Sequence, residues 1–410
     1  MRVLKFVLSA AIVVGALVGA ASPASAQGCI LLRQTSPMFG TSGSPDQEVG
    51  SWNITFTGRN STADRHWNGT VEQVQRQTDK TYVVNRQNSM TATIGYQWSP
   101  RFSVNVGIPF VEASWGIPSP RAGGPGARAN ENARGFGDIT SLARVSLFNP
   151  GTSTRTWNIQ VGGGVKFPTG KSGSTDVFPD GNGLNNAERY VDISVNPGDG
   201  GWGIITDLQG FKAMGRVMTF GSGTWLMNPK DTGMPSRGNL VTATAPSNVN
   251  TVSDQFIFRA GSSVTITRRV AASVAWRMEG VPRYDLIGSS HGFRRPGVEM
   301  YIEPGVTVTA GRHSMSFNLP VGYYRNRFRN PYTGNPGDST FPAVVAIATY
   351  STRFGGKAAH MDHGPTDQPA PVRIPGRPRA SQEQGDGLPL ASQQAAAAQT
   401  QDAAPPSHQP

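Results

Sequence analysis

The chain has 410 residues, with 50 glycines, 15% charged residues, one cysteine and a formal net charge of +11 at pH 7. The single cysteine excludes an intramolecular disulfide framework, and no apolar run beyond the first 21 residues is long enough for a membrane-spanning helix. Abundant glycine with little charge favours short strands joined by turns.

The N-terminal residues have the pattern of a secretory signal. Arg2 and Lys5 precede an apolar run over residues 6–21, and Ala24-Ser25-Ala26 supplies a small-x-small cleavage pattern. We therefore predict a signal peptide over residues 1–26, with an uncleaved anchor as the alternative. Export argues against nucleic acid as the partner of this basic chain and favours lipopolysaccharide phosphates or anionic solutes.

Residues 27–49 lack the alternation that follows them. We predict that they form an irregular periplasmic leader, or a plug that enters the lumen from the periplasmic side. The sole cysteine, Cys29, lies near the predicted cleavage point, but Gln27 stands where a lipoprotein signal has a small residue. Cys29 is therefore predicted to be an ordinary thiol, with lipidation as the alternative.

Strand-like alternation runs through residues 50–354. In residues 102–110, for example, Phe, Val and Ile at even positions alternate with Ser, Asn, Gly and Pro at odd positions. Such a period of two places the two sets on opposite faces of a strand. About twelve strands are predicted, at residues 50–59, 88–98, 101–113, 136–148, 154–168, 201–211, 215–227, 254–266, 269–280, 297–310, 313–326 and 342–354.

The connections between these strands alternate between short and long. The short turns are residues 99–100, 149–153, 212–214, 267–268 and 311–312, and long loops lie between them. Short turns at one rim and long loops at the other are typical of outer-membrane barrels, whereas a soluble sandwich has no reason to sort its loops. We predict an all-β fold: a transmembrane antiparallel up-and-down β-barrel of about 12 strands over residues 50–354, with both termini periplasmic.

The last predicted strand carries a further signal. It ends in Tyr350-Ser-Thr-Arg-Phe354, which resembles the closing-strand signal that the bacterial barrel-assembly machinery recognises. That machinery, together with outer-membrane lipid and lipopolysaccharide, is a predicted partner. Residues 355–410 change to Ala, Gln, Pro, Ser and Asp and cannot bury enough apolar surface to offset their ordering entropy, so they are predicted to be a disordered tail.

Ten charged residues are expected to line the lumen, because they share the polar phase of the strands or lie beside it. They are Arg59, Asp138, Arg144, Lys166, Asp207, Arg259, Arg277, Glu279, Glu299 and Glu303. A basic residue facing lipid at the midplane would cost about 2–4 kcal/mol. We expect Arg277 to pair with Glu299 or Glu303, and Asp138 with Lys166.

Two interpretations of these charges stay open. In the first, the basic residues bias an open pore toward anions; these are Arg144, Lys166, Arg259 and Arg277. In the second, the charges form a ladder that fills and rigidifies the lumen, because side chains largely fill the interior of small barrels.

Four short motifs follow one another in the barrel region. A strand ends in Ile108-Pro109, and Gly135-Phe-Gly-Asp-Ile-Thr140, Val165-Lys-Phe-Pro-Thr-Gly170 and Asn196-Pro-Gly-Asp-Gly-Gly-Trp202 come after it. In this order they resemble the bacterial outer-membrane family called "MetA-pathway of phenol degradation", whose members are often described as transporters. The resemblance implies a barrel that passes aromatic or other small hydrophobic compounds. From the residues alone, the glycines are expected to allow tight turns, with Asp138 capping the turn that it occupies.

Two other chemistries were considered for the long loops. Asp176, Asp180, Asn182 and Asp192 lie among glycines between residues 169 and 200, and oxygen ligands on such a loop suit Ca²⁺; ordinary turn residues look the same. Catalysis by outer-loop residues would draw on Asp64, His66, Ser289 and His291.

Three functions remain open. A passive channel for small solutes, with aromatic or hydrophobic compounds among them, is the first. The second is a structural or partner-binding barrel that transports nothing, and the third is a barrel enzyme. We expect no enzymatic activity and no resident cofactor.

Overall fold

The computed structural model describes residues 48–118, 127–149, 156–179, 186–235, 249–289, 291–331 and 338–356. The predicted signal peptide, nearly all of the leader with Cys29, and the predicted tail beyond residue 356 lie outside these ranges, so they stay predictions. The helix in the described residues is α2 (Gln75–Thr78). No helix in these ranges is both long and apolar enough to cross a membrane.

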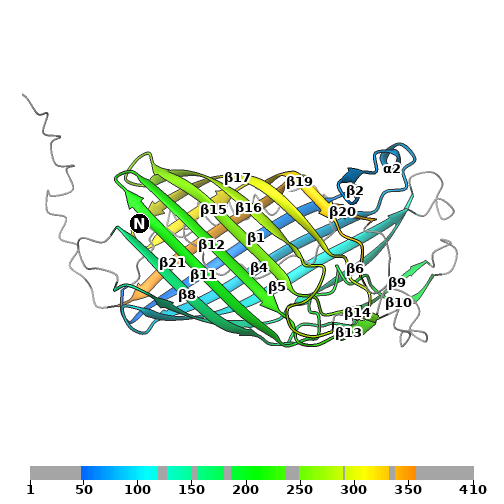
Figure 1. The fold of residues 1–410 in the computed structure, drawn as a ribbon, viewed down its shortest axis with the longest axis horizontal. Coiled ribbons are helices and arrows are strands. Elements are labelled where there is room, and N and C mark those ends of the chain that lie inside the picture. The colour runs from blue at the N-terminus through cyan, green and yellow to red at the C-terminus, as the bar shows by residue number, and fades with distance from the viewer. Residues whose placement is uncertain are drawn as a thin grey trace, which may run out of the picture. The chain divides into compact units, whose positions relative to one another are not determined.

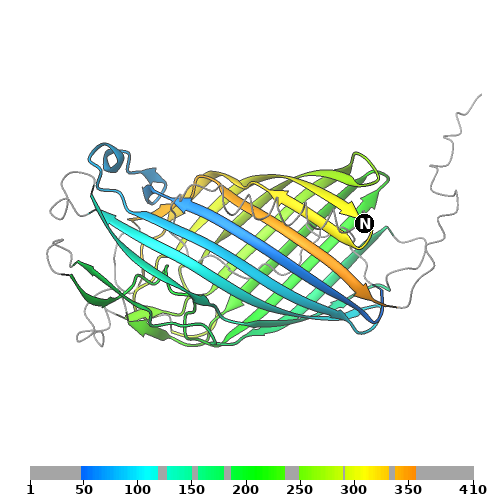
Figure 2. The ribbon, with the colours of Figure 1, turned by 180° about the vertical axis from the view of Figure 1, so that it is seen from behind.

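Twelve antiparallel strand positions form one closed barrel (Figures 1 and 2). In chain order they are β1 (Ser51–Ala63), β4 (Val84–Gln97), β5 (Phe102–Pro118), β6 (Arg128–Phe136) with β7 (Thr140–Ser146), β8 (Trp157–Lys166), β11 (Gly203–Met214), β12 (Val217–Met227), β15 (Gln255–Thr265), β16 (Val270–Val281), β17 (Gly297–Ala310), β18 (His313–Asn318) with β19 (Val321–Arg327), and β21 (Val345–Gly355).

The barrel closes where its first and last strands meet. β1 pairs with β21 from Ser51↔Gly355 to Ser61↔Val345, so the sheet has no free edge there. Each remaining position pairs with the positions next to it in the chain. Closure satisfies the backbone hydrogen bonds that hydrocarbon cannot satisfy. The predicted fold class, a 12-stranded up-and-down barrel, is confirmed.

Two barrel positions are interrupted, although the sequence predicts continuous strands there. Between β6 and β7 the pairing with β5 breaks over residues 137–139. Between β18 and β19 it breaks at Leu319 and Pro320. Proline has no N–H to donate to the ladder, which explains the second break.

The barrel is apolar outside and polar inside. In β1, Asn53, Thr55 and Arg59 are buried, whereas Trp52 and Phe56 are more than 40% exposed. Other strands show the same inversion: Met90, Val161, Leu208, Val274 and Ile302 are exposed. A water-soluble protein buries such side chains, so this outer surface fits a lipid environment.

Aromatic side chains form a belt near each rim. Toward the short turns, Trp52 packs against Tyr96 at 4.7 Å between ring centroids, and Phe148 against Trp157 at 4.5 Å. Toward the long loops, the pairs are Phe110–Phe136, Phe167–Trp202 and Trp225–Phe256. Two such belts are typical of the two membrane–water interfaces.

Three small sheets lie at the long-loop end, where Figure 1 shows β2, β9, β10, β13 and β14 together. Their strands are β2 (Arg65–Asn68), β3 (Val71–Glu72) and β20 (Asp338–Phe341) in one sheet, β9 (Thr175–Pro179) and β10 (Asn186–Tyr190) in another, and β13 (Thr232–Pro235) and β14 (Val249–Thr251) in the third. The loops at this end therefore have structure of their own.

Candidate functional site

The lumen holds a continuous network of buried charges. Arg59 Nη2 lies 2.6 Å from Glu279 Oε1, and Arg277 Nη2 lies 2.9 Å from Glu279 Oε2. Arg277 Nη1 also lies 3.3 Å from Glu303 Oε2, and Arg259 Nη2 lies 2.7 Å from Glu303 Oε1. Cations and carboxylates thus alternate, with two glutamates shared among three arginines.

This network crosses the interior instead of following one wall. Arg59 is on β1 and Glu279 on β16, and these strands are not neighbours in the sheet. Every member of the network is at most 6% exposed. A buried charge is tolerated when it is paired and hydrogen-bonded, and losing one partner of such a pair typically costs about 3–5 kcal/mol.

A second ion pair lies across β8. Arg144 Nε on β7 donates to Asp207 Oδ1 on β11 at 2.7 Å, and Thr224 Oγ1 donates to Asp207 Oδ2 at 2.8 Å. Gly162 of β8 lies beneath the pair: a Cβ there would stand 3.0 Å from Asp207 Cβ and 3.2 Å from Arg144 Cγ. Glycine at this position therefore lets the two side chains meet.

Glu299 has a different environment from the one expected. Its carboxylate accepts a hydrogen bond from the Tyr301 hydroxyl, and both side chains are buried. Of the two partners expected for Arg277, the structure places Glu303 within ion-pair distance. The second carboxylate beside Arg277 is Glu279, two residues along the same strand.

Three glycines from three of the sequence motifs meet at the outer rim, and we call this contact the glycine junction (Gly137, Gly170 and Gly198). A Cβ on Gly170 would stand 2.8 Å from the carbonyl carbon of Gly137 and 2.8 Å from Gly198 Cα. A Cβ on Gly198 would stand 2.6 Å from the carbonyl carbon of Gly170. Only residues without a side chain fit so close a backbone approach.

Hydrogen bonds and ion pairs of Asp138 and Lys166 stabilise the glycine junction. Asp138 Oδ1 accepts from Gly170 N at 2.9 Å, and Asp138 Oδ2 accepts from Asp199 N at 3.1 Å. Asp138 thus binds two other segments, instead of capping only its own turn as expected. Lys166 Nζ lies 3.9 Å from Asp138 Oδ2 and makes a closer ion pair with Asp199.

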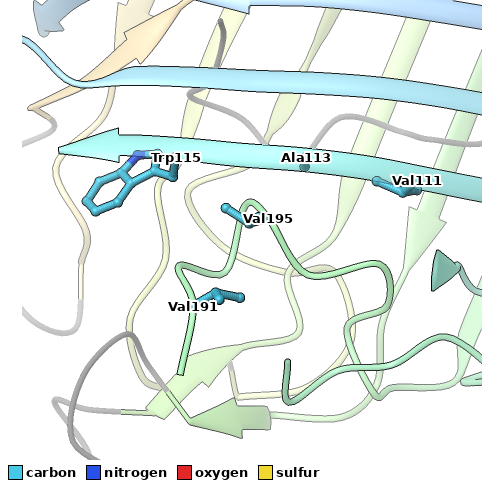
Figure 3. Close-up of a cluster of buried hydrophobic side chains, with 5 residues drawn as sticks. All are labelled: Val111, Ala113, Trp115, Val191 and Val195. Atoms are coloured by element: carbon cyan, nitrogen blue, oxygen red, sulfur yellow. The ribbon is translucent and has the colours of Figure 1, made fainter. Parts of the chain in front are cut away.

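The glycine junction holds the loop between β8 and β11 folded into the barrel. Figure 3 shows Val191 and Val195 of this loop facing Val111, Ala113 and Trp115, which lie on the inward phase of β5. These five side chains form a buried apolar cluster, which we call the mouth cluster. Packed apolar side chains therefore fill part of the outer lumen, unlike the region of the charged network.

Polar contacts fix the same loop to β4, the neighbour of β5, and to a loop on the other side of the lumen. Asn85 Nδ2 on β4 donates to Ser194 Oγ at 2.8 Å, and Gln87 Nε2 donates to the Ser194 carbonyl at 2.6 Å. Arg295, from the loop between β16 and β17, forms a bidentate ion pair with Asp192 at 2.7 and 2.6 Å. The loop thus spans the mouth and joins opposite walls.

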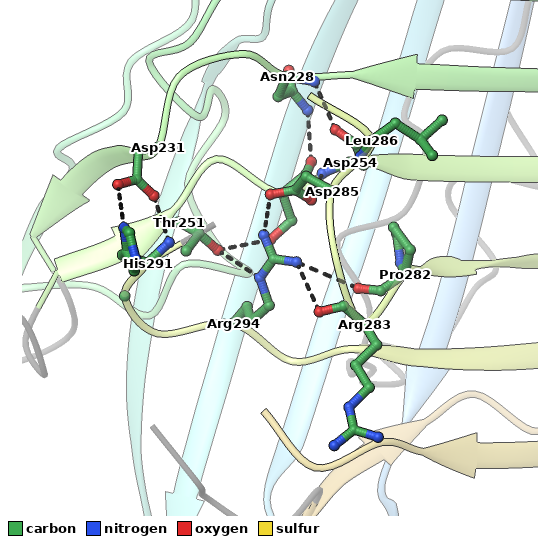
Figure 4. Close-up of polar contacts among 12 residues, drawn as sticks. Asn228, Asp231, Thr251, Asp254, Pro282, Arg283, Asp285, Leu286, His291 and Arg294 are labelled. Carbon is green, nitrogen blue, oxygen red and sulfur yellow. Dashed lines mark hydrogen bonds and ion pairs between the residues drawn. The ribbon is translucent and has the colours of Figure 1, made fainter. Parts of the chain in front are cut away.

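A second group of loop residues binds Arg294, which precedes Arg295 in the chain (Figure 4). Asp254 accepts from the backbone N–H groups of Asn228 at 2.8 Å and Leu286 at 2.9 Å, and its own N–H donates to Asp285. Asp285 in turn forms an ion pair with Arg294. Burial raises the pKa of the Asp254 carboxyl, and the two backbone donors oppose that rise. These contacts bind the loops between β12 and β15 and between β16 and β17 to each other.

The residues considered for Ca²⁺ do not converge where they are described. Asp176 accepts from Asn132 N at 2.8 Å and Asn132 Nδ2 at 3.1 Å, whereas Asp192 binds Arg295. Asp180 and Asn182 lie outside the described residues. Within the described ranges, no group of three or more His, Cys, Asp or Glu residues is placed to hold a metal ion. Calcium binding stays a prediction.

The four residues considered for catalysis do not form a Ser-His-Asp arrangement. His66 Nε2 accepts from Val83 N at 2.8 Å. His291 Nδ1 lies 2.8 Å from Asp231 Oδ2 in an exposed pair, and no hydrogen bond joins Asp64 or Ser289 to either histidine in the described part of the chain.

A closed antiparallel barrel with a polar lumen, an apolar exterior and two aromatic belts is the architecture of outer-membrane β-barrels. Among solved structures, the chain is similar to the COG4313 outer membrane channel from Pseudomonas putida F1, with a TM-score of 0.53 and 10% sequence identity over 78% of this chain and 100% of that one.

Other barrels are less similar. The translocator domain of the autotransporter NalP from Neisseria meningitidis has a TM-score of 0.41 at 11% identity, covering 76% of this chain and 91% of that one. The Pseudomonas putida toluene transporter TodX has a TM-score of 0.39 at 10% identity, covering 81% and 100%. No protein-family model and no curated protein matches the chain. At such identities the likeness to the first channel shows a shared fold.

Proposed function

We propose that this chain is an outer-membrane channel that passes small solutes by passive diffusion. The observation that carries the proposal is the inverted barrel: a closed sheet with an apolar exterior around a buried polar lumen. Such a wall gives polar atoms a protected path through hydrocarbon. A transport role without catalysis is part of the proposal.

The site geometry favours uncharged solutes. Each of the four basic residues considered for anion selectivity has a carboxylate within ion-pair distance: Arg144, Lys166, Arg259 and Arg277. Paired charges leave little field to attract anions. The mouth cluster, with Trp115 and four aliphatic side chains, is buried between β5 and the loop. When the loop moves, these side chains offer a surface suited to aromatic or hydrophobic compounds. The resemblance to the phenol-degradation family supports the same substrate class.

The proposal also includes an orientation. Short turns face the periplasm and long loops face outward, as in single-chain outer-membrane barrels, so both ends of the barrel sequence are periplasmic. Lipopolysaccharide is then the lipid at the long-loop rim. Phe354 is exposed on the outer face of β21, and Tyr350 lies on the same phase; this placement supports recognition of the strand by the barrel-assembly machinery.

One observation favours a second function, a structural or partner-binding barrel that transports nothing. The Arg59–Glu279 pair crosses the lumen, and the loop between β8 and β11 spans the mouth. If neither the ion pair nor the loop moves aside, no solute passes, and the long loops are the surface that can bind a partner.

Liposome swelling separates the two functions. Purified full-length chain is reconstituted, and swelling is measured in arabinose and in phenyl glucoside, a water-soluble aromatic solute. A channel of the proposed kind gives faster swelling than protein-free liposomes, with phenyl glucoside entering at least as fast as the smaller arabinose. Absence of swelling in both solutes would favour the non-transporting barrel, and entry of arabinose alone would reject the aromatic preference.

A further inference from the structure

Six exposed cations gather at the short-turn rim of the barrel. They lie in the short turns or at the strand ends beside them: Arg101, Lys212, Arg216, Arg268, Arg269 and Arg312. We call this set the basic rim. One contact restrains it, a hydrogen bond from Arg101 Nε to the Ser146 carbonyl at 2.7 Å. Five different strands bring these charges together: β5, β11, β12, β16 and β18 begin or end beside them.

No comparable negative charge faces these cations. Among the described residues, Glu48 is the carboxylate near this rim, and no ion pair joins a member of the basic rim to a carboxylate of the described ranges. The opposite end differs, because carboxylates lie among its cations and form ion pairs with some of them, as in Arg65–Glu72 and Arg295–Asp192. Within the described ranges, the basic rim is therefore uncompensated positive charge, which requires an anionic partner or counterions.

The aromatic belt shows what lies next to this charge. Trp98 is 70% exposed and stands three residues before Arg101. Lys212 is the register partner of Trp157 on β8. Exposed tryptophan and tyrosine in a barrel belt lie at the level of lipid headgroups. The basic rim, at or just beyond that belt, is thus level with the headgroup phosphates.

We propose that the basic rim binds anionic phospholipid headgroups of the leaflet in which the short turns lie. Guanidinium groups match phosphate oxygens in geometry and charge, and clusters of cations at a membrane surface bind anionic lipid cooperatively. The inference rests on the proposed function in taking the short-turn rim as the phospholipid side and the long-loop rim as the lipopolysaccharide side.

The test uses the purified full-length chain in a neutral detergent. Binding of phosphatidylglycerol and of phosphatidylethanolamine is measured by native mass spectrometry and by the shift in unfolding temperature on adding each lipid. The rim variant carries Arg216→Gln, Arg268→Gln, Arg269→Gln and Arg312→Gln. A matched control carries four substitutions of exposed cations at the other end: Lys80→Gln, Lys171→Gln, Lys230→Gln and Arg283→Gln.

We expect the native chain to bind phosphatidylglycerol at least tenfold more tightly than phosphatidylethanolamine, with less preference at high salt. The rim variant should lose that preference, and the control variant should keep it. Equal preference in the rim variant and the native chain would overturn the proposal, as would equal losses in both variants. Tighter binding of lipid A or polyaspartate than of phosphatidylglycerol would also overturn it.

Channel measurements keep this outcome separate from the proposed function. The rim variant should retain the swelling rates of the native chain, because its substitutions lie outside the lumen and the mouth. Loss of lipid preference with normal swelling supports both proposals. Normal lipid preference in a chain that gives no swelling would reject the channel and leave the lipid-binding rim intact.

Discussion

Glu303 is the carboxylate that joins two arginines in the lumen. Substituting Glu303→Gln leaves Arg259 without its carboxylate partner and Arg277 with Glu279 alone. We expect the free energy of unfolding to fall by about 3–5 kcal/mol, since an unpaired buried charge is costly, and the pore to become anion-selective. Unfolding in urea and reversal potentials in a KCl gradient measure the two effects.

Glu112→Gln is the matched control for that change, because Glu112 is exposed on the opposite phase of β5. It should alter stability by less than about 0.5 kcal/mol and leave selectivity unchanged. If Glu303→Gln changes stability and selectivity no more than this control does, the network of buried charges in the lumen contributes to neither property.

The glycine junction makes a second residue-scale prediction. Gly170→Ala places a methyl group against the backbone of Gly137 and Gly198, so the loop between β8 and β11 must move. We expect a larger single-channel conductance and faster proteolysis of that loop. Gly163→Ala in β8 is the control, since nothing lies within 4 Å of its added Cβ. Equal conductance in the two variants would show that the junction does not hold the mouth.

At this scale the sequence predicted which side chains face inward but few of their partners. Alternation assigns a face to Arg277 and Lys166, because the period of a strand is two. It gives no information on contacts between distant segments. Asp199, the close partner of Lys166, lies 33 residues further along in a loop, and its motif predicted only a tight turn. Arg295 and Asp254 carried no strand signal and were missed, and Asp192 was predicted only as a calcium candidate and not as the partner of Arg295.

At the scale of elements, strands that alternate between apolar and polar residues were predicted, and a strand without this alternation was missed. Twelve strands were predicted and twelve positions are present, with β17 matching its predicted bounds. The outer half of one position, β6, was missed because Arg128-Ala-Asn-Glu-Asn-Ala-Arg-Gly135 lacks an apolar phase. A strand extending beyond the membrane needs no lipid-facing side, so periodicity cannot reveal it.

The loop that spans the mouth yields the element-scale prediction. Asp192→Ala removes the carboxylate that forms the bidentate ion pair with Arg295 and that accepts a hydrogen bond from Ser194 N. We expect faster liposome swelling in phenyl glucoside, because the loop loses its attachment to the loop between β16 and β17. Glu72→Ala, which breaks the more exposed Arg65–Glu72 pair, should leave the rate unchanged. A swelling rate in Asp192→Ala equal to that of Glu72→Ala would contradict a gating role for this contact.

The architecture of the whole molecule was predicted most completely. In a membrane, a chain with alternating strands must close into a barrel to satisfy its backbone hydrogen bonds. Its orientation gives the last prediction. In a Cys29→Ser background, a cysteine at exposed Thr78 in α2 should react with a membrane-impermeant maleimide on intact cells. A cysteine at exposed Met214, beside a short turn, should react only after the outer membrane is permeabilised. Labelling of the Met214 position on intact cells would reverse the proposed orientation.

The contacts of Asp138 have a consequence for the order of assembly. This one carboxylate binds Gly170, 32 residues away, and Asp199, 61 residues away. Pairing of β7 with β8 and of β8 with β11 brings Gly170 and Asp199 to Asp138. We therefore expect the entrance to narrow only after these strands have paired, as a late event in folding.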